Sequence, residues 1–186
     1  MISAKIKNQT IQRISQCDIF QDLTIIEKFN KENDKISVQY IKFPLIICLN
    51  QDCDLNSDFR ERNNGNNSNK DCRLFHLIVA PLFNIDSFKQ GQHWGGIFDT
   101  GRGISLNRTE GQKIVNNEDP RYHYLHFDDK CTSPDLIIDF KHFFTINTEY
   151  MYDNINKRVC SLRELYREKI SQRFAFYQSR IGLPDK

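Results

Sequence analysis

The sequence lacks long apolar segments, an excess of charge of either sign, and any complete catalytic motif. None of its stretches approaches the roughly 18 consecutive apolar residues of a membrane-spanning helix, and residues 1–9 do not contain the apolar core of a signal peptide. Lys and Arg (26) nearly balance Asp and Glu (24), so the net charge of +2 gives the whole chain no attraction to nucleic acid or an anionic membrane. We therefore expect a cytoplasmic protein without a membrane partner, in which any nucleic-acid binding depends on a local surface.

The chain length and the cysteines favour one domain without disulfide bonds. A chain of 186 residues is long enough for one hydrophobic core, so we expect a single domain over residues 1–186. The six cysteines lie at irregular positions, several inside apolar runs, which is typical of buried reduced thiols.

Two apolar runs, residues 45–49 and 74–80, are predicted to form central strands. Each is too short for a typical helix, and its β-branched and aromatic content suits a strand buried on both faces. Residues 36–40 alternate as a half-buried strand should, and the polar turn at residues 28–35 makes a hairpin with the preceding strand plausible. We predict an α+β fold with a strongly bent mixed or antiparallel sheet, or a partly closed small β-barrel, built from strands near residues 17–26, 36–41, 44–49, 74–80, 122–127 and 136–146.

Three segments between the predicted strands have other patterns. Residues 56–71 are rich in Asn and have too little apolar surface to offset the entropy of ordering them, so we expect a flexible loop. A short helix is expected around residues 85–88. The glycines between residues 91 and 103 match neither the Walker A nor the dinucleotide-binding spacing, which favours a flexible loop there as well.

The clearest pattern in the sequence predicts a long C-terminal helix over residues 161–181 that packs against the sheet. Ser161 and Glu164 have the spacing of a capping box, and the apolar positions follow the helical period. Gly182 and Pro184 then supply the stop signal.

Arg173 lies near the middle of the apolar arc of this helix, with Lys169 and Arg180 close by. A guanidinium in that position must reach water, a carboxylate or an anionic ligand. Two interpretations stay open. One is a structural ion pair, for which Asp54 is the preferred partner and Asp18 and Asp52 are alternatives, and the other is an anion-binding site with Lys169 and Arg180 nearby.

Asp52, Cys53 and Asp54 follow a predicted central strand, a frequent position for functional groups, and are candidate binding residues in an acidic turn. The alternative is that the two carboxylates cap the turn. Flanking negative charge disfavours a thiolate and argues against a Cys53 nucleophile. A zinc site of Cys48, Cys53, Cys72 and His76 is not expected, because residues four apart on a strand lie about 13 Å apart.

A second candidate site resembles the core of PD-(D/E)xK nucleases, in which two carboxylates bind Mg²⁺ and a lysine positions or activates water. Asp128 or Asp129 ends one predicted strand, and Asp139 and Lys141 lie on the next. The alternative is a plain solvent-facing strand, in which Asp139 and Lys141 lie on the polar face and His142 on the core side.

Asp18-Ile19 stands at the start of a predicted strand, Pro44 lies within the strand of residues 43–47, and a further strand ends in Ala80-Pro81. In these features residues 16–82 resemble the small β-barrels of the MazF/PemK family. The resemblance implies a small barrel of a family that cleaves RNA. Leu82-Phe83 stands where that family commonly has a Thr or Ser, and no arginine lies between Asp18 and Gln39, so the family's catalytic residues are not matched.

Because each catalytic constellation is incomplete, we predict a non-catalytic binding or adaptor module of a bacterial toxin–antitoxin or phage-defence system. Its expected partner is RNA or another protein, and it needs no cofactor. The alternative is a metal-dependent nuclease that uses Asp128, Asp139 and Lys141 with Mg²⁺. Cleavage of RNA or DNA only in the presence of the metal distinguishes the second function from the first.

Overall fold

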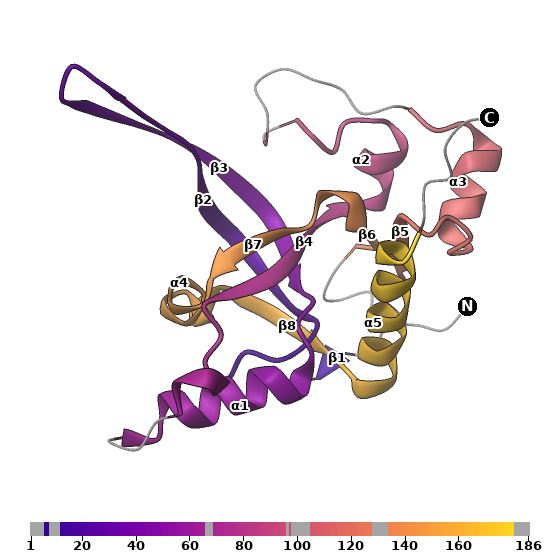
Figure 1. Cartoon of the computed structure of the whole chain (residues 1–186). Coiled ribbons are helices and arrows are strands. Elements are labelled where there is room, and N and C mark those ends of the chain that lie inside the picture. Colours follow the sequence, from indigo (N-terminus) through magenta and orange to yellow (C-terminus); the bar gives the residue numbers. More distant parts are fainter. Residues whose placement is uncertain are drawn as a thin grey trace, which may run out of the picture.

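The computed structural model describes residues 6–7, 12–65, 69–95, 97, 105–127 and 134–180 and shows an α+β fold (Figure 1). Its sheet has the strand order β1-β8-β2-β3-β4-β6-β5, with β7 beside β4, and every pairing is antiparallel. The strands are β1 (Ile6–Lys7), β2 (Asp18–Glu32), β3 (Lys35–Cys48), β4 (His76–Asn84), β5 (Tyr122–Leu125), β6 (Leu136–Asp139), β7 (Phe144–Asn147) and β8 (Arg158–Leu162). The predicted fold class is thus confirmed, but within these ranges the outermost strands β1 and β5 do not pair, so the sheet is not closed into a barrel.

In the described residues, five α-helices and three short 3-10 turns accompany the sheet. The helices are α1 (Asp52–Arg62), α2 (Ile85–Lys89), α3 (Arg108–Val115), α4 (Thr148–Asp153) and α5 (Glu164–Gln178), and the 3-10 turns are η2 (Lys70–Cys72), η3 (Phe140–His142) and η4 (Ile155–Lys157). Helix α2 confirms the short helix expected around residues 85–88. No helix in the described part of the chain is long and apolar enough to cross a membrane.

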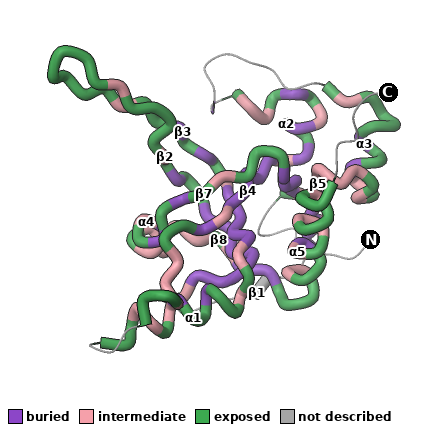
Figure 2. Tube along the Cα trace, viewed as in Figure 1, coloured by how far each residue is buried: buried purple, intermediate pink, exposed green. Residues whose placement is uncertain are grey.

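The centre of the sheet is buried on both faces, as the apolar runs predict. Along β3, Ile46 and Cys48 belong to one core cluster, whereas Ile47 belongs to a second cluster on the opposite face. β4 divides in the same way, because Val79 joins the first cluster and Ala80 the second. Figure 2 shows the buried residues concentrated where these strands cross the body. A strand with two covered faces needs apolar side chains at consecutive positions, which explains the absence of alternation.

Helix α5 covers the second core cluster and confirms the predicted C-terminal helix. Its Ile170 is fully buried there, and Phe174 packs on Phe140 with ring centroids 5.4 Å apart. The predicted capping box is wrong, however. Ser161 lies in β8 and its hydroxyl donates to the buried Asp18 carboxylate (2.5 Å), while the N-cap residue Arg163 makes no side-chain capping bond.

Residues 52–62, part of which was predicted as an Asn-rich loop, form helix α1. Leu55 and Asp58 are both fully buried, and the Asp58 carboxylate accepts hydrogen bonds from Arg62 Nε (2.8 Å) and from the backbone N–H of Leu74 (2.8 Å). This helix buries the ion pair of Asp58 and Arg62 where other helices bury apolar side chains. Its sequence therefore lacks the apolar period that predicts a helix. Residues 66–68 of the predicted loop lie outside the described residues.

The predicted strand at residues 136–146 is interrupted by η3. The Asp139 side chain accepts a hydrogen bond from the backbone N–H of Lys141 (3.0 Å) and so caps this turn, after which β7 pairs with β4. The alternating faces predicted for this segment are therefore wrong. Asp139 is fully buried, whereas Lys141 and His142 are exposed.

Candidate functional site

The acidic residues predicted as a binding turn occupy the first turn of α1. The Asp52 carboxylate lies 3.2 Å from Arg13 and 3.1 Å from Arg167 of α5, so it joins two segments of the body. Cys53 and Asp54 are exposed, and their helical conformation corrects the predicted turn.

Arg173 has a different partner from the predicted carboxylate. Its guanidinium donates to three backbone carbonyl oxygens, those of Asn117 (2.8 Å), Asp119 (2.7 Å) and Tyr122 (2.8 Å). Burial lowers the pKa of this guanidinium. These hydrogen bonds connect α5 to the segment that leads into β5. The predicted ion pair with Asp54 is therefore wrong, whereas the prediction that Arg173 needs a polar partner is correct.

The other two basic residues predicted as binding residues are exposed, Lys169 on α5 and Arg180 two residues after the end of this helix. Lys169 lines a cavity of about 540 Å³ together with His123 of β5. Arg180 lies over the ring of Tyr177, with 4.3 Å between the guanidinium carbon and the ring centroid. Lys169, Arg173 and Arg180 therefore have different surroundings rather than one shared anion site.

The candidate nuclease residues differ in their exposure to solvent. Asp139 is fully buried and accepts two hydrogen bonds from Arg121, at 2.9 Å from Nε and 2.7 Å from Nη2. Lys141 is exposed, and Asp128 lies outside the described residues. Among the described residues, no three His, Cys, Asp or Glu side chains form a group that could hold a metal ion.

Replacing Asp139 by Asn is expected to lower the free energy of unfolding by about 1–3 kcal/mol, because the charge-assisted bonds to Arg121 are lost. Urea unfolding measures this change, with Lys141→Met as a neutral control. The nuclease alternative is checked by incubating RNA and DNA with the same proteins, with and without Mg²⁺ or Mn²⁺. Unchanged stability together with loss of metal-dependent cleavage would identify Asp139 as a metal ligand instead.

A long hairpin arm, formed by residues 24–42, projects from the body with most of its residues exposed (Figures 1 and 2). β8 pairs with β2 only at residues 18–20, and β4 pairs with β3 only at Ile46–Cys48, so the described sheet narrows to two strands beyond these points. Asn33 and Asp34 have positive φ angles (47° and 60°) and close the two-residue turn at the tip. At about 3.3 Å per residue, the arm extends roughly 25–30 Å.

One face of the arm is apolar and exposed. Ile26 pairs with Tyr40, and Phe29 with Val38, and directly opposite residues in an antiparallel pair share a face. A bulge at residue 27 keeps Phe29 on that face. We call this face the apolar stripe; its members are Ile26, Phe29, Ile36, Val38 and Tyr40. All except the half-buried Val38 have between 59% and 63% of their surface exposed.

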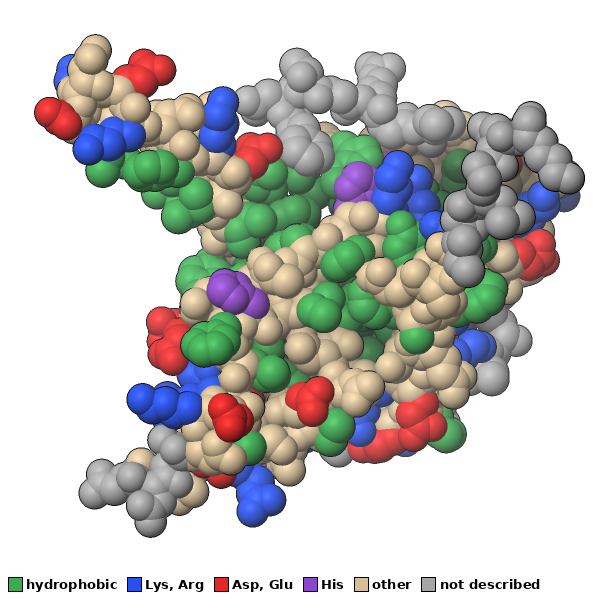
Figure 3. Space-filling model, viewed as in Figure 1, with side chains coloured by type: hydrophobic (Ala, Val, Ile, Leu, Met, Phe, Trp, Pro, Cys, Tyr) green, Lys and Arg blue, Asp and Glu red, His purple; other side chains and the backbone are tan. Residues whose placement is uncertain are grey.

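The apolar stripe continues into a hollow where the arm meets the body. A cavity of about 520 Å³ lies there, lined by Ile26 and Tyr40 of the arm and by His76, Ile146 and Tyr150 of the body. The Tyr150 hydroxyl accepts a hydrogen bond from the backbone N–H of Thr24 (3.2 Å) and fixes the base of the arm. Figure 3 shows hydrophobic side chains along the side of the arm that faces the body and within this hollow.

The sequence indicated the hairpin but not its exposed face. The alternation of Ile36, Val38 and Tyr40 correctly predicts a strand. It also predicts that one face of this strand is buried, and this is wrong, because no other described segment covers that face. The polar residues at 28–32 were interpreted as a turn, although Phe29 among them belongs to the stripe. No known protein-family model matches the chain, and a comparison with curated proteins finds no match.

Proposed function

We propose that the protein is a non-catalytic binding module that docks a partner protein on the apolar stripe of its hairpin arm. The observation that supports this proposal most strongly is the exposure of four large apolar side chains on a two-stranded ribbon. Such a ribbon is at best marginally stable in water unless its apolar face packs against something. An exposed contiguous apolar surface of this kind is typical of protein interaction sites.

Charge favours a protein partner over RNA. The arm, residues 24–42, has four lysines and three carboxylates, and a net charge of +1 gives little attraction to a phosphate backbone. The stripe also contains more aliphatic than aromatic side chains, whereas single-stranded nucleic acid is usually bound by stacking on aromatic rings. The open outer edges of the arm add backbone groups that an extended segment of the partner can pair with.

Replacing Ile36 and Tyr40 by Thr is expected to weaken partner binding by about 30-fold or more, because a buried aromatic anchor alone contributes on the order of 2 kcal/mol. Thr is β-branched and suits an exposed strand position, so thermal stability should change little. The matched control changes Ser37 and Gln39, on the opposite face, to Thr and should bind normally.

The partner is identified by placing a photo-crosslinking amino acid at Phe29 and, for comparison, at Gln39 in the native host cell. The expected result is one protein crosslinked from position 29 and not from position 39, and its affinity for the purified variants is then measured. Equal crosslinking from both positions, or normal binding by the Ile36 and Tyr40 double variant, contradicts the proposal. Crosslinking to RNA alone would make nucleic acid the partner.

A further inference from the structure

The apolar stripe of the arm has an ion pair at each end. At the tip, Lys31 Nζ lies 3.6 Å from the Asp34 carboxylate. At the base, Lys42 Nζ lies 2.7 Å from the Asp22 carboxylate. Lys31 is directly opposite Ile36 in the hairpin, so its side chain lies on the face of the stripe. All four charged side chains are more than half exposed and can meet the charges of another molecule.

The order of these charges is opposite on the two strands of the arm. On the β3 side, the acidic Asp34 lies at the tip and the basic Lys42 at the base. On the β2 side, the basic Lys31 lies at the tip and the acidic Asp22 at the base. When a second arm lies on this face in the opposite direction, each tip meets the base of the other copy, and opposite charges meet on both strands. A two-fold dimer requires such a self-complementary surface.

The apolar side chains match the same arrangement. Ile36, Val38 and Tyr40 alternate along β3 and lie on one face, which Lys42 continues toward the base. In a pair of antiparallel arms centred on Val38, this residue contacts its own copy and Ile36 contacts Tyr40. Asp34 then meets Lys42, because both lie four positions from Val38. One register therefore covers the apolar side chains of β3 and pairs its charged ends.

The hollow at the base of the arm has room for the tip of the second arm. Ile26 and Tyr40 line this cavity of about 520 Å³. Because Ile36 of the second copy contacts Tyr40 in this register, its side chain enters the hollow. Phe29 is directly opposite the central Val38 and therefore packs against Phe29 of the second copy. All five members of the stripe become covered, which no described segment of the same chain achieves.

We propose that the partner of the apolar stripe is a second copy of this chain, and that the two arms pack face to face in opposite directions about a two-fold axis at Val38. This inference rests on the proposed function, because it names the partner of the same stripe. A single two-stranded ribbon is marginally stable in water, whereas two ribbons packed in this way enclose their apolar faces between two sheet layers. An unrelated partner would not require charges that complement the stripe itself.

Analytical ultracentrifugation of the purified full-length protein measures its mass over a range of concentrations, and a dimer is expected. Lys42→Glu and Asp34→Lys should each weaken this dimer by about tenfold or more, because either change creates a like-charge contact at both ends of the symmetric interface. Thermal unfolding of each variant shows that it is folded.

A mixture of the two variants gives the most specific result. In the mixed dimer, one contact joins the two substituted positions, which again have opposite charges, and the other contact keeps the native Lys42 and Asp34. The mixture should therefore form a dimer about as stable as that of the wild type, although neither variant does so alone. A dimer that formed through another surface would not show this rescue.

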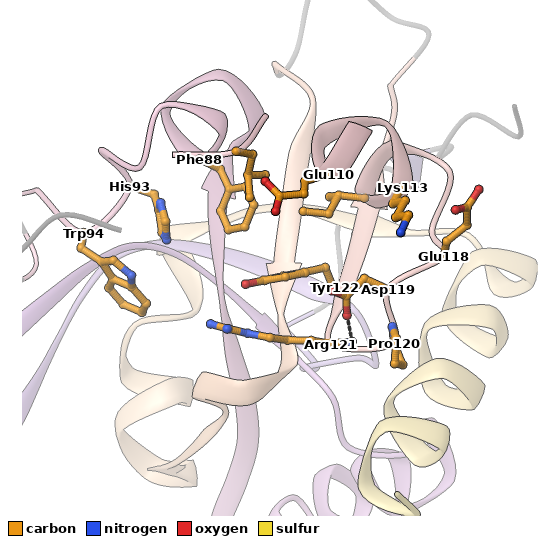
Figure 4. Close-up of a pocket in the computed structure, with 12 residues that line it drawn as sticks. Phe88, His93, Trp94, Glu110, Lys113, Glu118, Asp119, Pro120, Arg121 and Tyr122 are labelled. Carbon is orange, nitrogen blue, oxygen red and sulfur yellow. Dashed lines mark hydrogen bonds between the residues drawn. The ribbon is translucent and has the colours of Figure 1, made fainter. Parts of the chain in front are cut away.

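Two lysine variants serve as matched controls. Lys28→Glu makes the same change of charge on the opposite face of the arm, where Lys28 pairs with Gln39. Lys113→Glu changes an exposed lysine of α3, at a cavity of about 810 Å³ to which the arm contributes no lining residue (Figure 4). Both variants should dimerise like the wild type.

The outcomes separate this inference from the proposed function. A protein that stays monomeric up to about 0.5 mM, where even a weak dimer would form, overturns the inference. The same holds if Lys42→Glu dimerises normally or if the mixture of variants stays monomeric. When such a result accompanies crosslinking of Phe29 to a different protein, the proposed function stands without the inference. A monomer that crosslinks to no protein from position 29 overturns both.

Discussion

Replacing Arg173 by Met is expected to lower the free energy of unfolding by about 3–5 kcal/mol, because three backbone carbonyls lose the charged donor that they share. Three backbone carbonyls, those of Asn117, Asp119 and Tyr122, accept hydrogen bonds from this guanidinium at 2.7–2.8 Å. Met fills a similar volume but donates nothing, so the carbonyls become unpaired at the interface between α5 and the β5 segment. Urea unfolding of the two proteins at neutral pH measures the difference.

The control for this prediction is Asp54, the carboxylate that the sequence predicts as the partner of Arg173. Asp54→Asn should leave stability unchanged, and its effect should add to that of Arg173→Met, because the two residues do not interact. Asp52→Asn and Arg167→Met should instead be non-additive, since these side chains lie 3.1 Å apart. Wild-type stability of Arg173→Met would contradict the anchoring role of the three carbonyl bonds.

Arg173 also shows which part of an interaction a sequence reveals. Its position in the apolar arc of a helix predicts that it needs a polar partner, and this is correct. The sequence identifies side chains, so a carboxylate was the natural choice, whereas the actual partners are main-chain oxygens of a segment 51–56 residues away. Every residue has a backbone carbonyl oxygen, so the sequence cannot show which of them accepts a hydrogen bond from Arg173.

The errors in secondary structure have a common physical cause, which is competition from buried polar side chains. Ser161 was predicted to cap α5 but is held by Asp18. Asp139 was predicted on a polar strand face but caps η3 and pairs with Arg121. Such local hydrogen bonds offer the backbone an alternative to regular structure. The apolar runs of β3 and β4 had no such competitor, and both were predicted as strands, although β3 joins the two strands predicted at residues 36–41 and 44–49 and β4 continues to Asn84.

The arm marks a further limit of prediction from sequence. Alternation along residues 36–40 shows that one face of the strand is apolar, but it cannot show what covers that face. In this protein the described residues leave it exposed, so the correct strand prediction and the wrong burial prediction arise from the same pattern. The apolar runs at the sheet centre differ because each strand there has neighbours on both faces.

The stability of the protein is expected to fall on acidification because of His123, whose side chain is only 5% exposed. Burial, followed by the charges of Arg173 and Lys169, lowers the pKa of this histidine to about 3. Its Nδ1 is buried and has no hydrogen-bond partner among the described residues, so no described acceptor stabilises a proton on this nitrogen. The unfolded chain takes up the proton near pH 6.5 while the folded protein does not.

The direction in which stability changes with pH follows from this difference in proton binding. The unfolded state binds more protons between about pH 6.5 and 3, so stability is complete above this window and decreases as the pH falls through it. From pH 7.5 to 4.5 the expected loss from His123 alone is roughly 2–3 kcal/mol, and near pH 3 it reaches roughly 4–5 kcal/mol.

The measurement compares urea unfolding at pH 7.5 and pH 4.5 for the wild type, His123→Phe and His76→Gln. Phe keeps a planar ring in the site but cannot be protonated, so the loss between the two pH values should shrink by roughly 2–3 kcal/mol in this variant. His76 is exposed, and its replacement should leave the loss as in the wild type. Because other groups, such as the buried Asp18, titrate equally in all three proteins, the comparison isolates His123. An equal loss in the wild type and in His123→Phe would mean that the folded protein protonates this ring as readily as the unfolded chain does, and the site would then have to admit water or a counter-charge to it.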